Sequence, residues 1–120
     1  MILADTSIWV EHFKKGSRVL AALLDSGRVL IHPWVIGELA LGGVSDESLA
    51  LITALPRAAT AADDELLGFI ARERMAGNGI GYVDTQLLAS TRLAPGGRLW
   101  TADGKLRTVA ERLALGYRPS

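Results

Sequence analysis

Cysteine is absent from this 120-residue sequence, which excludes disulfides, thiolate metal sites and a cysteine nucleophile. A surplus of charge is also missing, because 13 basic residues balance 13 acidic ones, and this excludes a strongly basic protein that coats nucleic acid. No apolar run approaches the ~20 residues needed to cross a bilayer, and Asp5 interrupts the N-terminus where a signal peptide needs basic residues. We therefore expect a cytoplasmic protein that does not associate with a membrane.

Hydrophobic residues make up 49% of the chain, enough for one compact core, so we expect a single domain over residues 1–120. Short apolar runs, typical of buried strands, alternate with segments of helical spacing. The predicted strands are 1–4, 29–31 and 98–101, and the predicted helices are 6–15, 17–26, 33–41, 46–55, 63–75, 83–93 and 106–114. This alternation predicts an α/β fold, with three α/β/α layers around a short central parallel sheet.

Four acidic residues occupy positions unlike those of ordinary surface acids. Asp5 directly follows the first predicted strand and Asp103 follows the last one, while Glu38 lies in an otherwise apolar helix and Asp84 near a helix start. Groups just beyond the carboxyl ends of parallel strands converge on one crevice, which places Asp5 and Asp103 together. Glu38 and Asp84 need tertiary folding to join them.

Several carboxylates in one pocket repel each other unless a cation is present. Hard oxygen ligands favour Mg²⁺ or Mn²⁺, and that chemistry suits phosphodiester hydrolysis. Each acid also has a purely structural interpretation: Asp5 and Asp84 as helix caps, Asp103 with Gly104 as a turn, and Glu38 as an exposed helical residue. The residues alone leave both interpretations open.

The segments around these acids resemble the PIN-domain nucleases, and most closely the VapC toxins of bacterial toxin–antitoxin pairs. "MILADTSIWVEHFKKG" is similar to the family's first strand, first acid and first helix, and "LIHPWVIGELALGG" to the segment with the helical glutamate. "GIGYVDTQLLAST" and "LWTADGKL" are similar to the segments with the third and fourth acids. The four segments have the family's order and spacing, and together they span nearly the whole chain.

The resemblance implies an endoribonuclease that depends on Mg²⁺ or Mn²⁺ and acts as the toxin of a VapBC-type pair. It implies tRNA or ribosomal RNA as substrate, a small antitoxin as partner, and a homodimer. The implied catalytic and metal-binding residues are Asp5, Glu38, Asp84 and Asp103, with Thr6 and Thr101 beside the metal or its waters.

One position departs from the family pattern. Family members commonly carry a basic residue between the Thr and the Asp of the last motif, where this chain has Ala102. Lys105 and Arg107 are the candidates to replace any phosphate contact from that position.

Other residues have weaker claims to a function. His12 and His32 are unnecessary as general bases in metal-assisted hydrolysis. The three tryptophans lie in apolar stretches where core packing is the default, and Trp34, one helical turn before Glu38, is the best candidate to stack on a base.

The basic residues and the glycines near the later motifs allow more than one interpretation. We expect the basic residues to border the pocket or to form a solvated helix face, and the "GNGIG" segment at 77–81 to be a flexible connection beside the pocket. The basic residues concerned are Arg92, Arg98, Lys105, Arg107 and Arg112.

Three other functions compete with the toxin. An aspartyl-phosphate phosphatase would use Asp5 as nucleophile, but its usual second Asp two residues later is Ser7 here. The other two are a stand-alone RNA-processing nuclease and a catalytically silent partner-binding module. Cleavage assays and toxicity on expression separate the three.

Overall fold

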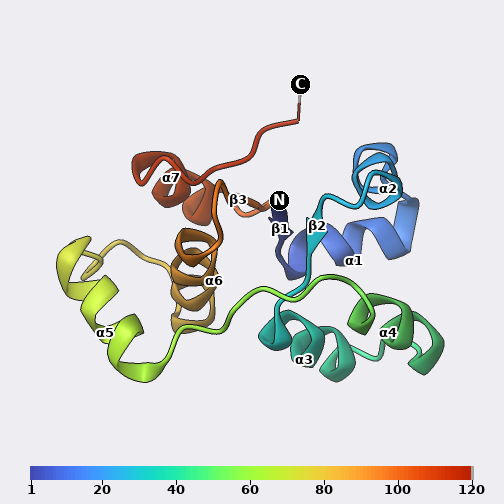
Figure 1. The fold of residues 1–120 in the computed structure, drawn as a ribbon, viewed down its shortest axis with the longest axis horizontal. Helices are drawn as coiled ribbons and strands as arrows, with labels where there is room; N and C mark the ends of the chain where they lie inside the picture. The colour runs from blue at the N-terminus through green and yellow to red at the C-terminus, as the bar shows by residue number, and fades with distance from the viewer. Residues whose placement is uncertain (120) are drawn as a thin grey trace.

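The computed structural model describes residues 1–119 and is built around a small parallel sheet (Figure 1). The sheet contains β1 (Ile2–Ala4), β2 (Val29–Leu30) and β3 (Arg98–Trp100) in the order β2-β1-β3. In the central strand, Leu3 pairs with Leu30 on one side and Leu99 on the other. All three residues of β1 are buried, as expected for a parallel strand covered on both faces.

Two further segments widen the sheet by single bridges. Ile31 pairs in parallel with Arg57, and Leu99 pairs in parallel with Gly116. Their backbone hydrogen bonds include Ala58 N to Ile31 O at 2.8 Å and Tyr117 N to Leu99 O at 2.8 Å. Five extended segments therefore lie side by side, with β1 in the middle.

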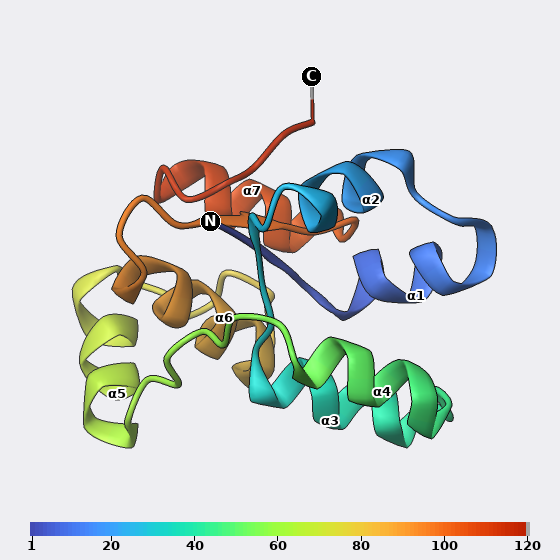
Figure 2. The same cartoon turned by 45° about the vertical axis from the view of Figure 1, so that its right-hand side comes forward.

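Seven helices surround these strands in the described part of the chain. They are α1 (Thr6–Lys15), α2 (Arg18–Asp25), α3 (Pro33–Leu41), α4 (Asp46–Thr53), α5 (Asp63–Arg72), α6 (Tyr82–Leu93) and α7 (Gly104–Arg112). Figure 1 shows them in two groups, α1 to α4 and α5 to α7, on either side of the strands, and in Figure 2 α5 and α6 lie at one end and α3 and α4 at the other. This is the predicted α/β architecture with helical layers around a short parallel sheet.

The strand order determines where a site can form. The chain passes from β1 to β2 on one side, and then crosses β1 to reach β3 on the other side. The connections therefore diverge between β1 and β3, and in parallel α/β sheets the crevice at this point, beyond the carboxyl ends of the strands, is the usual ligand site. Asp5 and Asp103 are the acids that follow these two strands.

The predicted elements are present, and the corrections concern their ends. The second helix begins at Arg18, because Ser17 is its N-cap and accepts the Leu20 N–H. The last helix begins at Gly104 instead of residue 106, because Asp103 caps it. No helix in residues 1–119 is long and apolar enough to span a membrane.

Candidate active site

Asp5 stands where β1 ends and α1 begins, with only 5% of its surface exposed. Its Oδ1 accepts the Ile8 N–H at 3.2 Å and the Ser7 hydroxyl at 2.5 Å. Burial raises the pKa of Asp5, while hydrogen bonds from Ser7, the Thr101 hydroxyl and Ile8 oppose that rise. Asp5 is therefore the N-cap of α1, as its structural interpretation predicted, and it also lies at the switch point of the sheet.

Ser7 connects Asp5 to the segment that carries Asp103. Its Oγ donates to Asp5 and accepts the Ala102 N–H at 3.0 Å, a contact between residues 95 positions apart. Ser7 was not among the site residues predicted from the sequence. The sequence signal for this contact is the position of Ser7 two residues after Asp5, because a Ser hydroxyl can hydrogen-bond to polar groups that are close in sequence.

Asp103 follows β3 and caps α7. Its Oδ1 accepts the Lys105 N–H at 2.9 Å, and its own N–H donates to Thr101 Oγ1 at 3.0 Å. Asp103 with Gly104 is therefore a helix start and not an isolated turn. Thr101 is buried and lies beside both strand-end acids.

Glu38 comes from α3 and is exposed. Its Oε1 accepts the Thr6 hydroxyl at 2.6 Å, which joins the middle of α3 to the first residue of α1. The side chain of Thr6, adjacent to Asp5, thus orients the glutamate toward the strand ends.

Asp84 connects the four acids electrostatically. It is the third residue of α6, and the N-cap of that helix is Gly81, so the interpretation of Asp84 as a cap is wrong. Burial raises the pKa of Asp84 to about 6, and the negative charges of Asp5, Asp103 and Glu38 contribute to that rise in this order. Four segments that are distant in sequence thus bring their carboxyl groups within mutual electrostatic reach.

A buried hydrogen-bond chain fixes α3 relative to α6. His32 Nδ1 accepts the Trp34 N–H at 3.0 Å and caps α3, so its Nε2 carries the proton and donates to Ser90 Oγ at 2.9 Å. Ser90 donates to Gln86 Oε1 at 2.9 Å, and Gln86 exchanges two hydrogen bonds with the backbone of Ala61. Because α3 carries Glu38 and α6 carries Asp84, this chain holds together the two acids that do not follow a strand.

The histidines have structural roles here. Burial lowers the pKa of His32, consistent with a neutral ring in the hydrogen-bond chain. His12 Nδ1 accepts the Ser17 N–H at 2.9 Å between α1 and α2. Neither contact involves one of the four acids.

Four of the five basic residues separate into two groups, and the fifth, Arg98, donates to the Ala114 carbonyl at 3.0 Å. Arg92 pairs with Glu73 at 3.1 Å and Arg112 donates to the Glu73 carbonyl, so these two do not border the acids. Arg92 is about 12 Å along α6 from Asp84, at the 1.5 Å rise of a helix. Lys105 and Arg107 lie in the first turn of α7, next to Asp103.

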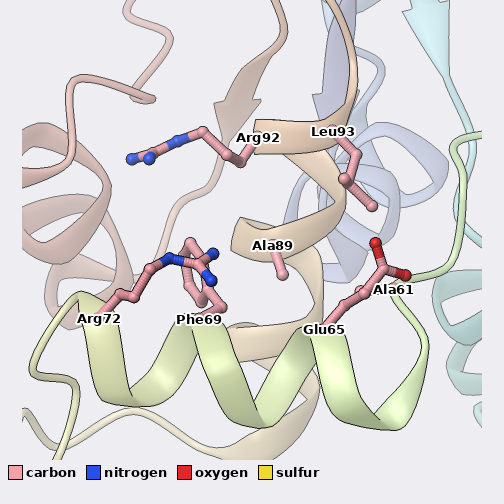
Figure 3. Close-up of a pocket in the computed structure, with 7 residues that line it drawn as sticks. All are labelled: Ala61, Glu65, Phe69, Arg72, Ala89, Arg92 and Leu93. Atoms are coloured by element: carbon pink, nitrogen blue, oxygen red, sulfur yellow. The ribbon is translucent and has the colours of Figure 1, made fainter.

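A pocket of about 160 Å³ lies between α5 and α6 (Figure 3). Arg72 and Arg92 line one part of it, and the Arg92 guanidinium lies 5.9 Å from the centre of the Phe69 ring. None of the four acids lines this pocket. It is separate from the candidate active site.

The donor set suits a hard divalent cation in chemistry and in charge. All four candidate ligands are carboxylates, and a cation would favour the ionised form of Asp84, whose pKa is raised first by burial and then by the charges of the other three acids. Within residues 1–119 no three Asp, Glu or His side chains already form a cluster ready to hold one ion. Glu38 Oε1 and Asp103 Oδ1 each accept one hydrogen bond, from the Thr6 hydroxyl and from the Lys105 N–H.

Comparison with known proteins shows the family to which this chain belongs. No family profile matches the chain. Ribonuclease VapC32 of Mycobacterium tuberculosis is 42% identical over 111 residues, which cover 91% of this chain and 90% of the relative, in each of two strains. The chain belongs to the VapC family of PIN-domain ribonucleases.

A solved structure shares the fold of this chain. The crystal structure of PAE2754 from Pyrobaculum aerophilum superimposes with a TM-score of 0.56 and covers 94% of this chain and 88% of that protein, at 16% sequence identity. At this identity the similarity concerns the fold alone. The resemblance to VapC proteins inferred from the four acidic segments is thus confirmed by a relative that spans nearly the whole chain.

Proposed function

We propose that this protein is the RNA-cleaving toxin of a VapBC-type toxin–antitoxin pair, formed by a single domain over residues 1–120. The observation that carries the proposal is the 42% identity to Ribonuclease VapC32 over 91% of this chain, in a fold that places Asp5 and Asp103 after neighbouring parallel strands. Membership of a family whose relative is named a ribonuclease supports RNA as the substrate. An RNA substrate in turn supports a cytoplasmic location.

We propose Asp5, Glu38, Asp84 and Asp103 as the groups that hold Mg²⁺ or Mn²⁺. Such an ion, when bound, supplies Lewis acidity for a phosphodiester and lowers the pKa of water. The protein's own groups prepare the site for it: Ser7 and Thr101 favour the ionised form of Asp5, and Thr6 orients Glu38. Above pH 6 Asp84 is mainly ionised, so this side chain is available as an anionic donor at neutral pH.

An apolar groove beside Glu38 is suited to the antitoxin. It has a volume of about 190 Å³ between the end of α1 and the end of α3, and it is lined by Val10, Phe13, Lys14, Glu38, Leu39, Gly42, Gly43 and Val44. Leu41 and Leu51 nearby in the chain are 91% and 75% exposed. An apolar antitoxin segment in this groove would bring a basic side chain to Glu38 and so block the site. We also propose a homodimer, for which these exposed leucines offer apolar surface.

The test is cleavage by the purified protein. RNA fragments should accumulate in Mg²⁺ or Mn²⁺. They should not form in chelator, or when the cognate antitoxin is present from the start. Expression alone should arrest growth, and co-expression of the antitoxin should restore it. Sequencing of the new RNA ends then identifies the target among tRNA and ribosomal RNA.

Each competing function predicts a different result. Cleavage without toxicity indicates a stand-alone RNA-processing nuclease. Antitoxin binding without cleavage in any divalent ion indicates a silent binding module. Release of phosphate from a phosphorylated Asp5 would indicate a phosphatase.

A further inference from the structure

We propose that Tyr82, supported from behind by Trp34, is a stacking platform for an unpaired base of the RNA next to the cleaved phosphodiester. This inference rests on the proposed ribonuclease function and names the form of RNA that the site accepts. It concerns the first residue of α6 and the second residue of α3, the two helices that carry Asp84 and Glu38.

The rings of His32, Trp34 and Tyr82 contact one another in this order, from the buried His32 to the exposed Tyr82. The buried His32 ring meets Trp34 edge-on, with centroids 6.0 Å apart and planes at 81°. Trp34 in turn contacts Tyr82, with centroids 6.2 Å apart and planes tilted by 40°. Trp34 is half-buried and Tyr82 is 51% exposed, so the rigid hydrogen-bond chain of His32 supports an aromatic ring at the surface.

This geometry determines how a base can bind. Rings whose centroids are 6.2 Å apart already touch, so a flat base does not fit between them and must stack on the outer face of Tyr82. Trp34 precedes Glu38 by four residues and shares its helix face, which places the aromatic pair beside the acids. A base in the interior of a duplex has no free face, so the platform selects looped or single-stranded RNA.

A positive charge lies near the same end of α6. Tyr82 borders a hollow of about 260 Å³ formed with the Gly77–Gly81 segment. A Cβ added to Gly79 would lie 3.7 Å from Lys105 Cδ and 3.9 Å from its Nζ, so the lysine packs against this segment. Lys105 is therefore placed to contact a phosphate that flanks the stacked base.

An exposed apolar residue on another helix provides the matched comparison. Leu67 of α5 is 58% exposed and Tyr82 is 51% exposed, and α5 carries none of the four acids. We expect Tyr82→Leu to raise KM for a short unstructured RNA about 5- to 150-fold with kcat unchanged, the range of a lost base–aromatic stack. Tyr82→Phe should retain the parent KM, and so should the control Leu67→Ala.

Binding is measured separately from cleavage in an Asp5→Asn background, by the anisotropy of a labelled eight-nucleotide RNA. Tyr82→Leu should weaken this binding by the same factor, and a duplex of the same sequence should compete poorly. The proposal is overturned if Tyr82→Leu leaves KM and binding unchanged, if it lowers kcat alone, or if Tyr82→Phe is as impaired as Tyr82→Leu. A parent protein that binds the RNA through Tyr82 but cleaves nothing would refute the ribonuclease function and leave the platform standing.

Discussion

Replacement of Asp84 by Asn tests whether the ionised Asp84, partly buried beside three other carboxyl groups, destabilises the native protein. The pKa of Asp84 rises from 3.8 to about 6, which makes its ionisation in the native protein roughly 3 kcal/mol less favourable, at about 1.4 kcal/mol per pKa unit. The side chain is only half-buried, so screening by solvent reduces this to about 1–2 kcal/mol. The lost attraction between Asp84 and the N-terminus of α6 offsets about 0.3–1 kcal/mol of the gain. We therefore expect Asp84→Asn to stabilise the protein by about 1 kcal/mol at pH 7.5 in chelator.

The pH dependence follows from the sign of the shift. Because the pKa of Asp84 is higher in the folded protein, the native state binds more protons than the unfolded chain between pH 4 and 6. The contribution of Asp84 to the free energy of unfolding of the parent is therefore greatest below pH 4. It falls as the pH rises through 6 and is constant at higher pH. The advantage of Asp84→Asn should accordingly vanish at pH 4.

Thermal melts in chelator at pH 4 and pH 7.5 measure this effect. At pH 7.5 the Tm of Asp84→Asn should exceed that of the parent by about 4 °C. Asp63→Asn is the matched control, since Asp63 is an exposed acid in the first turn of α5, and it should lower Tm slightly at both pH values. Excess Mn²⁺ should stabilise the parent more than Asp84→Asn. An Asp84→Asn protein that melts below the parent at pH 7.5 would refute the strained pocket.

Three further substitutions test the contacts around the site. Ser90→Ala should cost about 1–3 kcal/mol in urea unfolding, because it leaves the buried Nε2–H of His32 without its acceptor, and a cost below about 0.5 kcal/mol would contradict that role. Asp103→Asn should melt like the parent, whereas Asp103→Ala should lose about 0.5–2 kcal/mol of unfolding free energy because it removes the cap of α7. Both variants should lose RNA cleavage. Parent-like cleavage by Asp103→Asn would show that Asp103 only caps the helix. Ser7→Ala should cost about 1–2 kcal/mol in urea unfolding and lower cleavage at least tenfold, while Ser7→Thr retains both, and an Ala variant as active as the parent would exclude a positioning role.

The sequence was sufficient for the fold because its local patterns agree with one another. Gly16 ends α1 with a φ of 75°, and Pro33 lies in the first turn of α3, so the predicted helix bounds are close to those observed. The apolar run at 1–4 is too short for a helix and lacks polar alternation, which is typical of a buried parallel strand. The order of the strands required the resemblance or the structure, since periodicity carries no information about neighbours.

The candidate site was only partly predictable for the same reason. Asp5 and Asp103 follow strands, so topology alone brings them together. Glu38 and Asp84 depend on the buried chain through His32, Ser90 and Gln86, whose members look like ordinary polar residues in sequence. The contact of Ser7 with Ala102 spans 95 positions and leaves no local pattern. The pairing of Tyr82 with Trp34 was missed because each residue belongs to a different helix.

Whether these carboxyl groups form one catalytic site is tested most directly by the cleavage of one RNA by five purified proteins. All five must be folded to the same extent. They are the parent, Asp5→Asn, Glu38→Gln, Asp84→Asn and the control Asp63→Asn, each assayed in Mg²⁺ and in Mn²⁺. We expect the three acid-site variants to lose at least about a hundredfold in cleavage rate, while the control cleaves like the parent. Parent-like cleavage by Asp84→Asn, with its fold intact, would contradict the central claim that these carboxyl groups form one catalytic site.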